Sequence, residues 1–89
     1  MGKNMVKLID FWAPWCGNCK AFAPVIDDVV GQTGVDCVKV DASVDMDLCN
    51  EYNVTNLPTI ILIKDGKEAE RINGLVSKEV LLDKIGKLK

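Results

Sequence analysis

The chain has 89 residues, of which 48% are hydrophobic and 27% charged, and this composition is typical of one globular domain spanning residues 1–89. Its net charge of −2 gives no broad attraction for phosphate backbones, so we expect no nucleic-acid partner. Charged residues interrupt the apolar stretches of residues 1–10, and no window approaches the run of about 20 apolar residues that a membrane span needs. We therefore expect a cytoplasmic monomer that does not bind membranes.

The first predicted elements are a strand and a helix. Residues 5–12 are apolar and β-prone, which predicts a buried strand interrupted by one acidic residue, Asp10. From about residue 18, apolar side chains recur at the spacing of an amphipathic helix that ends within residues 31–34. Pro24 lies inside this helix, where it removes a backbone donor, and we expect a kink there.

The middle of the chain repeats this alternation. Residues 35–41 predict a second strand, parallel to the first, which completes a right-handed βαβ unit. Asp45 is placed to cap a short helix that runs to about Tyr52. Residues 59–63 are strongly apolar and predict a central strand of the sheet.

The last third predicts a hairpin followed by a helix. The Asp65-Gly66 pair is typical of a tight turn, so the strand over residues 68–73 should run antiparallel to the central strand. Ser77 is placed to cap the final helix, with Val76 and Leu81 as its hydrophobic staple. The fold class is therefore α/β, with element order β-α-β-α-β-β-α and a four-stranded mixed sheet flanked by three helices.

Two cysteines, with two residues between them, stand at the predicted start of the first helix. Because a helix N-terminus stabilises a thiolate, Cys16 is the candidate nucleophile and Cys19 the thiol that resolves a mixed disulfide. A zinc site would need a second compact cysteine pair or histidines, but the chain has no histidine. A purely structural disulfide is also disfavoured, since closing so small a loop removes little unfolded-state entropy.

Several residues outside the cysteine pair are candidates for either a functional or a structural role. Asp10 is either a proton acceptor or a satisfied buried acid, and Lys39 on the neighbouring strand is its candidate charge partner. Cys37 and Cys49 are expected to be small buried core residues rather than regulatory thiols. We expect Trp12 to lie in the core as well. The other tryptophan of the motif, Trp15, could contribute to an apolar docking surface.

The segment Asp10-Phe-Trp-Ala-Pro-Trp-Cys-Gly-Asn-Cys-Lys20 strongly resembles the active-site segment of thioredoxins. The resemblance continues at matching intervals over most of the chain, and its further positions are Pro24, Lys39, Val54-Thr-Asn-Leu-Pro-Thr59 and Gly74. It implies a minimal thioredoxin fold with a cis proline at Pro58, and it makes Asp10 the proton acceptor for Cys19, assisted by Lys39. The residues expected to contact substrate are Trp15, Gly17, Asn18, Leu57, Pro58 and Gly74.

The resemblance implies a protein-disulfide reductase that needs no cofactor beyond the Cys16–Cys19 pair. Its partners would be disulfide-containing proteins and a separate reductase, commonly a flavoprotein, as electron donor. Asn18 replaces the proline that thioredoxins commonly have, which leaves the reduction potential open and keeps a more oxidising oxidase or isomerase role as an alternative. The short length leaves no room for the usual first strand and helix. This minimal size resembles that of glutaredoxins, so glutathione-linked exchange is a further alternative. A binding module without redox chemistry is another.

Overall fold

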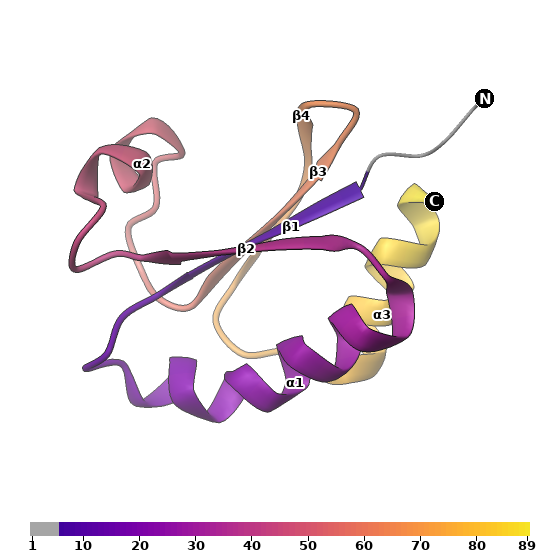
Figure 1. Ribbon diagram of the computed structural model, residues 1–89, viewed down its shortest axis with the longest axis horizontal. Helices are drawn as coiled ribbons and strands as arrows, with labels where there is room; N and C mark the ends of the chain where they lie inside the picture. The colour runs from indigo at the N-terminus through magenta and orange to yellow at the C-terminus, as the bar shows by residue number, and fades with distance from the viewer. Residues whose placement is uncertain (1–5) are drawn as a thin grey trace.

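A computed structural model describes residues 6–89 and contains four strands and three helices in the predicted order (Figure 1). Met5, the first residue of the predicted strand, lies outside the described residues. The elements are β1 (Val6–Trp12), α1 (Gly17–Thr33), β2 (Asp36–Asp41), α2 (Met46–Glu51), β3 (Thr59–Lys64), β4 (Lys67–Asn73) and α3 (Lys78–Leu88).

The strands form one mixed sheet with the order β2-β1-β3-β4. Strands β1 and β2 are parallel, whereas β3 runs antiparallel to both of its neighbours, β1 and β4. The predicted βαβ unit, the central position of β3 and the Asp-Gly hairpin are therefore confirmed.

Two apolar layers cover the sheet because successive strand residues point to opposite faces. On one face, Leu8 of β1 and Leu62 of β3 pack with residues of α1 and α3. On the other face, Phe11 and Ile61 pack with the partly buried α2 residues. Figure 1 shows α1 and α3 together on one side of the sheet, with α2 apart from them. This arrangement sets both α1 and α2 against the β1 strand that leads into the cysteines.

Local signals define the helix ends. The side chains of Asp45 and Ser77 accept backbone hydrogen bonds at the starts of α2 and α3, as predicted. Helix α1 ends at Gly34, whose φ of 71° is the left-handed conformation that glycine adopts without steric cost. Pro24 lies inside α1, and the kink expected there stays a prediction. Among residues 6–89, no helix is long and apolar enough to cross a membrane.

Candidate functional site

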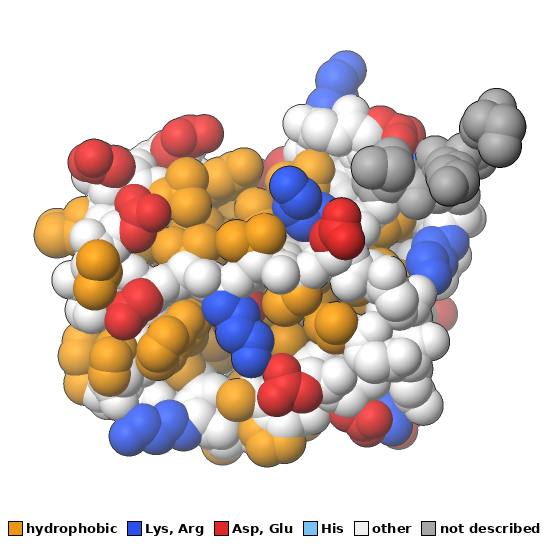
Figure 2. All heavy atoms as spheres, in the orientation of Figure 1, with side chains coloured by type: hydrophobic (Ala, Val, Ile, Leu, Met, Phe, Trp, Pro, Cys, Tyr) orange, Lys and Arg blue, Asp and Glu red, His pale blue; other side chains and the backbone are white. Residues whose placement is uncertain are grey.

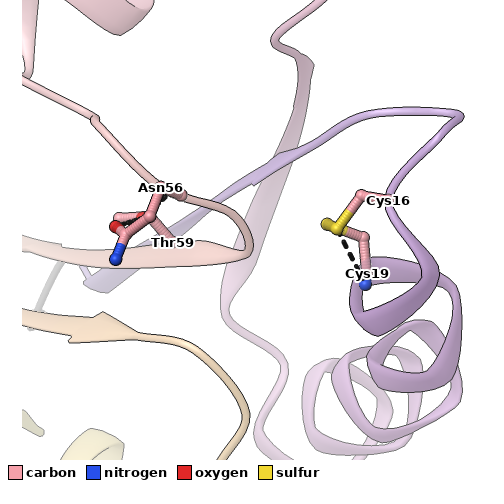
Figure 3. Close-up of a disulfide and its surroundings, with 4 residues drawn as sticks. All are labelled: Cys16, Cys19, Asn56 and Thr59. Atoms are coloured by element: carbon pink, nitrogen blue, oxygen red, sulfur yellow. Dashed lines mark hydrogen bonds between the residues drawn. A yellow bond between two sulfur atoms is a disulfide. The ribbon is translucent and has the colours of Figure 1, made fainter.

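The two motif cysteines lie where β1 passes into α1, and they form a disulfide with their Cα atoms 5.3 Å apart (Figure 3). Cys16 is the N-cap residue of α1, in an extended conformation. Its sulfur accepts a hydrogen bond from the backbone N–H of Cys19 at 3.1 Å. The sulfur of Cys16 thus takes the place of the capping oxygen at a helix N-terminus, where the helix dipole favours negative charge.

A groove beside the disulfide distinguishes the two cysteines. Both side chains are largely buried, at 8% exposed for Cys16 and 6% for Cys19. Cys16 nevertheless lines a groove of about 470 Å³, and Cys19 is not among its lining residues. The groove is lined by Trp15, Cys16, Ala42, Met46, Cys49, Asn50, Val54, Thr55, Asn56 and Leu57. A molecule lying in the groove therefore contacts Cys16 but not Cys19.

The loop before β3 forms the wall of the site opposite α1. The Leu57–Pro58 peptide bond is cis, as the resemblance implies. Leu57 packs against the cluster formed by Ala13, Cys16 and Cys19. The Thr59 hydroxyl donates a hydrogen bond of 2.6 Å to the Asn56 carbonyl oxygen within the loop (Figure 3). The loop is thus held in position beside the disulfide.

The remaining predicted substrate contacts divide into two groups. Trp15 is 73% exposed and lines the groove next to Cys16, as expected for a docking surface. Gly17 and Asn18 are exposed at the start of α1 but do not line the groove. Gly74 also lies outside the groove lining, although its N–H donates to the Pro58 carbonyl oxygen at 2.8 Å. Trp12, expected in the core, is half-buried against the cysteine cluster.

Asp10 is a buried acid, 6% exposed, in the middle of β1. Burial raises the pKa of Asp10 to about 6, because desolvation disfavours the charged carboxylate. The positive charge of Lys39 lowers this pKa and the negative charge of Asp27 raises it, both by smaller amounts. A carboxyl group with a pKa near neutrality is suited to exchange protons at physiological pH.

Lys39, the candidate charge partner of Asp10, lowers the pKa of Asp10 through its charge, and its ion pair is with Asp27. Lys39 stands opposite Asp10 in the parallel pairing of β1 and β2, but its Nζ bonds the Asp27 carboxylate at 2.9 Å. Lys39 therefore acts on Asp10 through space only. The direct partner of Lys39 is Asp27 of α1, a residue whose role was not predicted from the sequence.

The other two cysteines, expected as small buried core residues, are half-buried and pack against the core. Cys37 packs against the core on the α1 side of the sheet, and Cys49 packs against the core on the α2 side. Burial raises the pKa of both thiols, and the carboxylates of Asp10 and Asp45 raise it further for Cys37 and Cys49, respectively. Both thiols are therefore poor nucleophiles at neutral pH.

The α2 wall of the groove was not identified from the sequence. Met46, Cys49 and Asn50 line the groove together because positions i, i+3 and i+4 share one face of a helix. That spacing is visible in the sequence, but the face that α2 turns to the cysteines depends on how it docks. Within residues 6–89, no group of three or more histidine, cysteine or acidic side chains is arranged to hold a metal ion.

Comparison with known proteins identifies what this site resembles. Residues 2–87 match the protein-family model described as Thioredoxin. The M-type chloroplast thioredoxin of Chlamydomonas reinhardtii is 39% identical over 82 residues, which cover 90% of this chain and 59% of that protein. Bacillus subtilis thioredoxin is 38% identical over 84 residues, covering 92% of this chain and 81% of the relative.

Solved structures agree with the sequence matches. A thioredoxin from Nicotiana alata superposes with a TM-score of 0.89 at 39% identity, covering 99% of this chain and 76% of its own. Fasciola hepatica thioredoxin has a TM-score of 0.86 at 34% identity, with 94% and 81% covered. The similarity therefore extends across the sheet and all three helices.

Proposed function

Because the chain belongs to the thioredoxin family of thiol-disulfide oxidoreductases, we propose that it reduces disulfides of other proteins, with Cys16 as nucleophile and Cys19 as resolving thiol. The observation that carries this assignment is the position of the two cysteines relative to the groove. Cys16 lines the groove, and Cys19 lies one helical turn further along α1, behind it.

The proposed reaction has two exchange steps. The Cys16 thiolate attacks one sulfur of a substrate disulfide, which breaks the substrate S–S bond, forms a mixed disulfide and releases the other substrate sulfur as a thiolate that takes up a proton. The Cys19 thiol then loses its proton and attacks the Cys16 sulfur. The mixed disulfide breaks, the Cys16–Cys19 disulfide forms, and the second substrate sulfur leaves as a thiolate that takes up a proton, so that two electrons have passed to the substrate.

The position of Cys16 at the N-cap of α1 supports its role in the first step. The N–H of Cys19 points at its sulfur, and the helix dipole adds a favourable field for the thiolate. Asp10 is the group that we propose takes the proton of Cys19 in the second step, with Lys39 acting on it through space. Its pKa of about 6 leaves it ionised and able to accept a proton at pH 7.

We propose that the substrate lies along the groove and the cis-proline loop. Its contacts would come from Trp15, Gly17, Asn18, Leu57, Pro58 and Gly74. The contacts proposed for Trp15 and Leu57 are supported by the position of both residues in the groove wall. The contacts proposed for Pro58 and Gly74 are supported by the hydrogen bond between their backbones, which holds both at one edge of the site.

The protein would act as a single-domain monomer whose only redox group is the cysteine pair. Electrons would come from the dithiol of a separate flavoprotein reductase, which reduces the Cys16–Cys19 disulfide by the reverse exchange. A reducing compartment such as the cytoplasm is the location we propose, because thiols such as Cys37 and Cys49 stay reduced there.

A trapping experiment tests the roles of the two cysteines. Reduced Cys19→Ser protein should accumulate a mixed disulfide with a disulfide-containing substrate protein, located at Cys16 by peptide mass spectrometry, because the second step is blocked. The matched Cys16→Ser variant should form none. Equal trapping in both variants would overturn the assignment of nucleophile and resolving thiol.

Asn18 favours one alternative strongly enough to be tested beside it. Since Asn18 keeps a backbone donor that proline lacks, the helix start could stabilise the thiolate further and make the protein a better oxidant. Equilibration in defined dithiothreitol buffers gives the potential. A midpoint well above that of thioredoxins, about −270 mV, would favour an oxidase, isomerase or glutathione-linked role.

A further inference from the structure

The groove beside Cys16 has an apolar floor and two exposed apolar side chains at its mouth. Trp15 from the α1 side is 73% exposed, and Met46 from α2 is 65% exposed. Val54 and Leu57 complete the apolar lining. Because Cys16 itself lines the groove, the groove is continuous with the proposed site of covalent exchange.

The α2 side of this groove carries negative charge without compensating bases of its own. Between residues 40 and 63 the sequence has no lysine or arginine. The carboxylates in this stretch are Asp41, Asp45, Asp47 and Glu51. In Figure 2, acidic side chains gather over α2 at the upper left of the molecule, around an apolar surface and with no basic side chain among them.

Two of these carboxylates are not engaged in holding the local structure. Asp41 accepts hydrogen bonds from Ser43, and Asp45 caps α2. Asp47 and Glu51 are exposed and stand four residues apart on α2, each directly after a groove-lining residue. They thus flank the groove as a pair along one side of the helix.

A base that reaches this segment, Arg71, is already paired with an acid of its own strand. Arg71 of β4 donates to the Tyr52 carbonyl oxygen at 2.6 Å, but it also forms a two-point pair with Glu68 at 2.8 and 2.9 Å. The negative charge also acts inside the groove, because Asp45 raises the pKa of the lining thiol Cys49. An approaching segment therefore experiences a negative potential on the α2 side.

We propose that this groove selects protein disulfides in which the attacked cysteine is flanked by an apolar residue and by lysine or arginine. The apolar residue would lie against Trp15 and Met46, and the basic residue would face Asp47 and Glu51. This selection deepens the proposed function and rests on it. A complementary charge raises the rate of encounter and fixes the direction in which the segment lies.

The test uses two synthetic peptides that differ only in the residues flanking one cysteine, lysine in one and glutamate in the other. Each is disulfide-linked to the same reporter peptide, and single-turnover reduction by the fully reduced protein is followed at low and high salt. We expect the lysine peptide to be reduced roughly 10-fold faster at low salt. The two rates should converge at 1 M salt, where the screening length is about 3 Å.

Matched variants place the effect on α2. In the double variant Asp47→Asn, Glu51→Gln, the ratio of the lysine-peptide rate to the glutamate-peptide rate should fall by at least about threefold. The control Asp65→Asn, Glu79→Gln changes net charge equally at exposed positions in the β3–β4 turn and in α3, where neither residue is next to one that lines the groove, and it should keep the preference. Equal rates for both peptides, or equal effects of both double variants, would overturn the charge selection alone. Failure to reduce either peptide would instead overturn the proposed function.

Discussion

Lys39 and Asp27 form an ion pair, with Nζ 2.9 Å from Oδ1, although the sheet register places Lys39 opposite Asp10. Both partners are substantially exposed, so the pair itself contributes little stability. The pair matters for the buried acid Asp10, because it holds the ammonium group of Lys39 at Asp27 instead of at Asp10. Asp27 also adds a negative charge that opposes ionisation of Asp10.

Replacing Asp27 by asparagine should therefore lower the pKa of Asp10. The substitution removes a repulsive charge and frees Lys39 to approach the carboxylate, and both changes favour the ionised form. Lys39→Met should have the opposite effect and raise this pKa. The measurement is an NMR titration of the Asp10 carboxyl carbon in the oxidised protein.

Asp28→Asn is the matched control for this titration. Asp28 is the next residue of α1 and pairs with Lys78 at 2.6 Å, so its removal changes net charge equally without touching Lys39. The Asp10 titration should move far less in this variant. A shift as large as that of Asp27→Asn would mean that general charge, not the ion pair, controls Asp10.

Burial of Asp10 should also make the stability of the oxidised protein depend on pH. Since its pKa is raised from 3.8 to about 6 in the folded state, the favourable contribution is fully present below pH 3.8 and is lost as the pH rises through 6. The cost at pH 7 to 8 is on the order of 3 kcal/mol. Asp10→Asn should recover up to about this amount at pH 8 and little at pH 4, as measured by denaturant unfolding at each pH.

The pH dependence of the difference is the decisive feature of that experiment. An asparagine that stabilised the protein equally at pH 4 and pH 8 would act through packing or hydrogen bonding instead of ionisation. Cys16 and Cys19 must stay oxidised throughout, because free thiols would add their own titrations.

The sequence was sufficient wherever structure follows from local chemistry. Asp45 and Ser77 cap helices because a short polar side chain reaches the backbone N–H three residues later. The Asp65-Gly66 turn and the alternating faces of β1 and β3 follow likewise from residue type and spacing. The cysteine motif was identified for the same reason.

Contacts that depend on docking were not predictable in this way. Lys39 could reach either of two acids, and only the position of α1 over the sheet decides for Asp27. Nothing local to Arg71 indicates that it reaches the end of α2, 19 residues away. The half-burial of Cys49 likewise reflects how a short helix lies against the sheet, and the pattern of apolar residues does not encode that angle.

Arg71 should hold the α2 wall of the groove in place. It donates to the carbonyl oxygens of Tyr52 and Asn53, directly after α2, while Glu68 fixes the guanidinium from the other side. Hydrogen bonds from a charged donor contribute about 1.5–3 kcal/mol when buried, and partial exposure reduces this to roughly 1–2 kcal/mol here. Arg71→Met should therefore speed hydrogen exchange of the Val54 amide, which bonds the Cys49 carbonyl, by about 10-fold.

Lys84→Met provides the comparison for the Arg71 variant. Lys84 of α3 pairs at 3.5 Å with Glu70, which lies on β4 beside Arg71. The side chain of Lys84 is about as exposed as that of Arg71, but this ion pair does not involve α2. Exchange at Val54 should stay near that of the unmodified protein. If both variants changed it alike, general loss of stability would explain the result and the clamp would have no specific effect.

Asn18→Pro should make the protein a stronger reductant. Asn18 lies in the first turn of α1, where backbone N–H groups have no helical partner and favour a thiolate at Cys16. Proline removes one of these donors, which destabilises the dithiol form relative to the disulfide. If removing this donor costs the thiolate about 1.4 kcal/mol of stabilisation, the midpoint falls by roughly 30 mV in dithiothreitol buffers. Asn18→Ala keeps the N–H, so a midpoint lowered equally in this variant would assign the effect to the asparagine side chain instead.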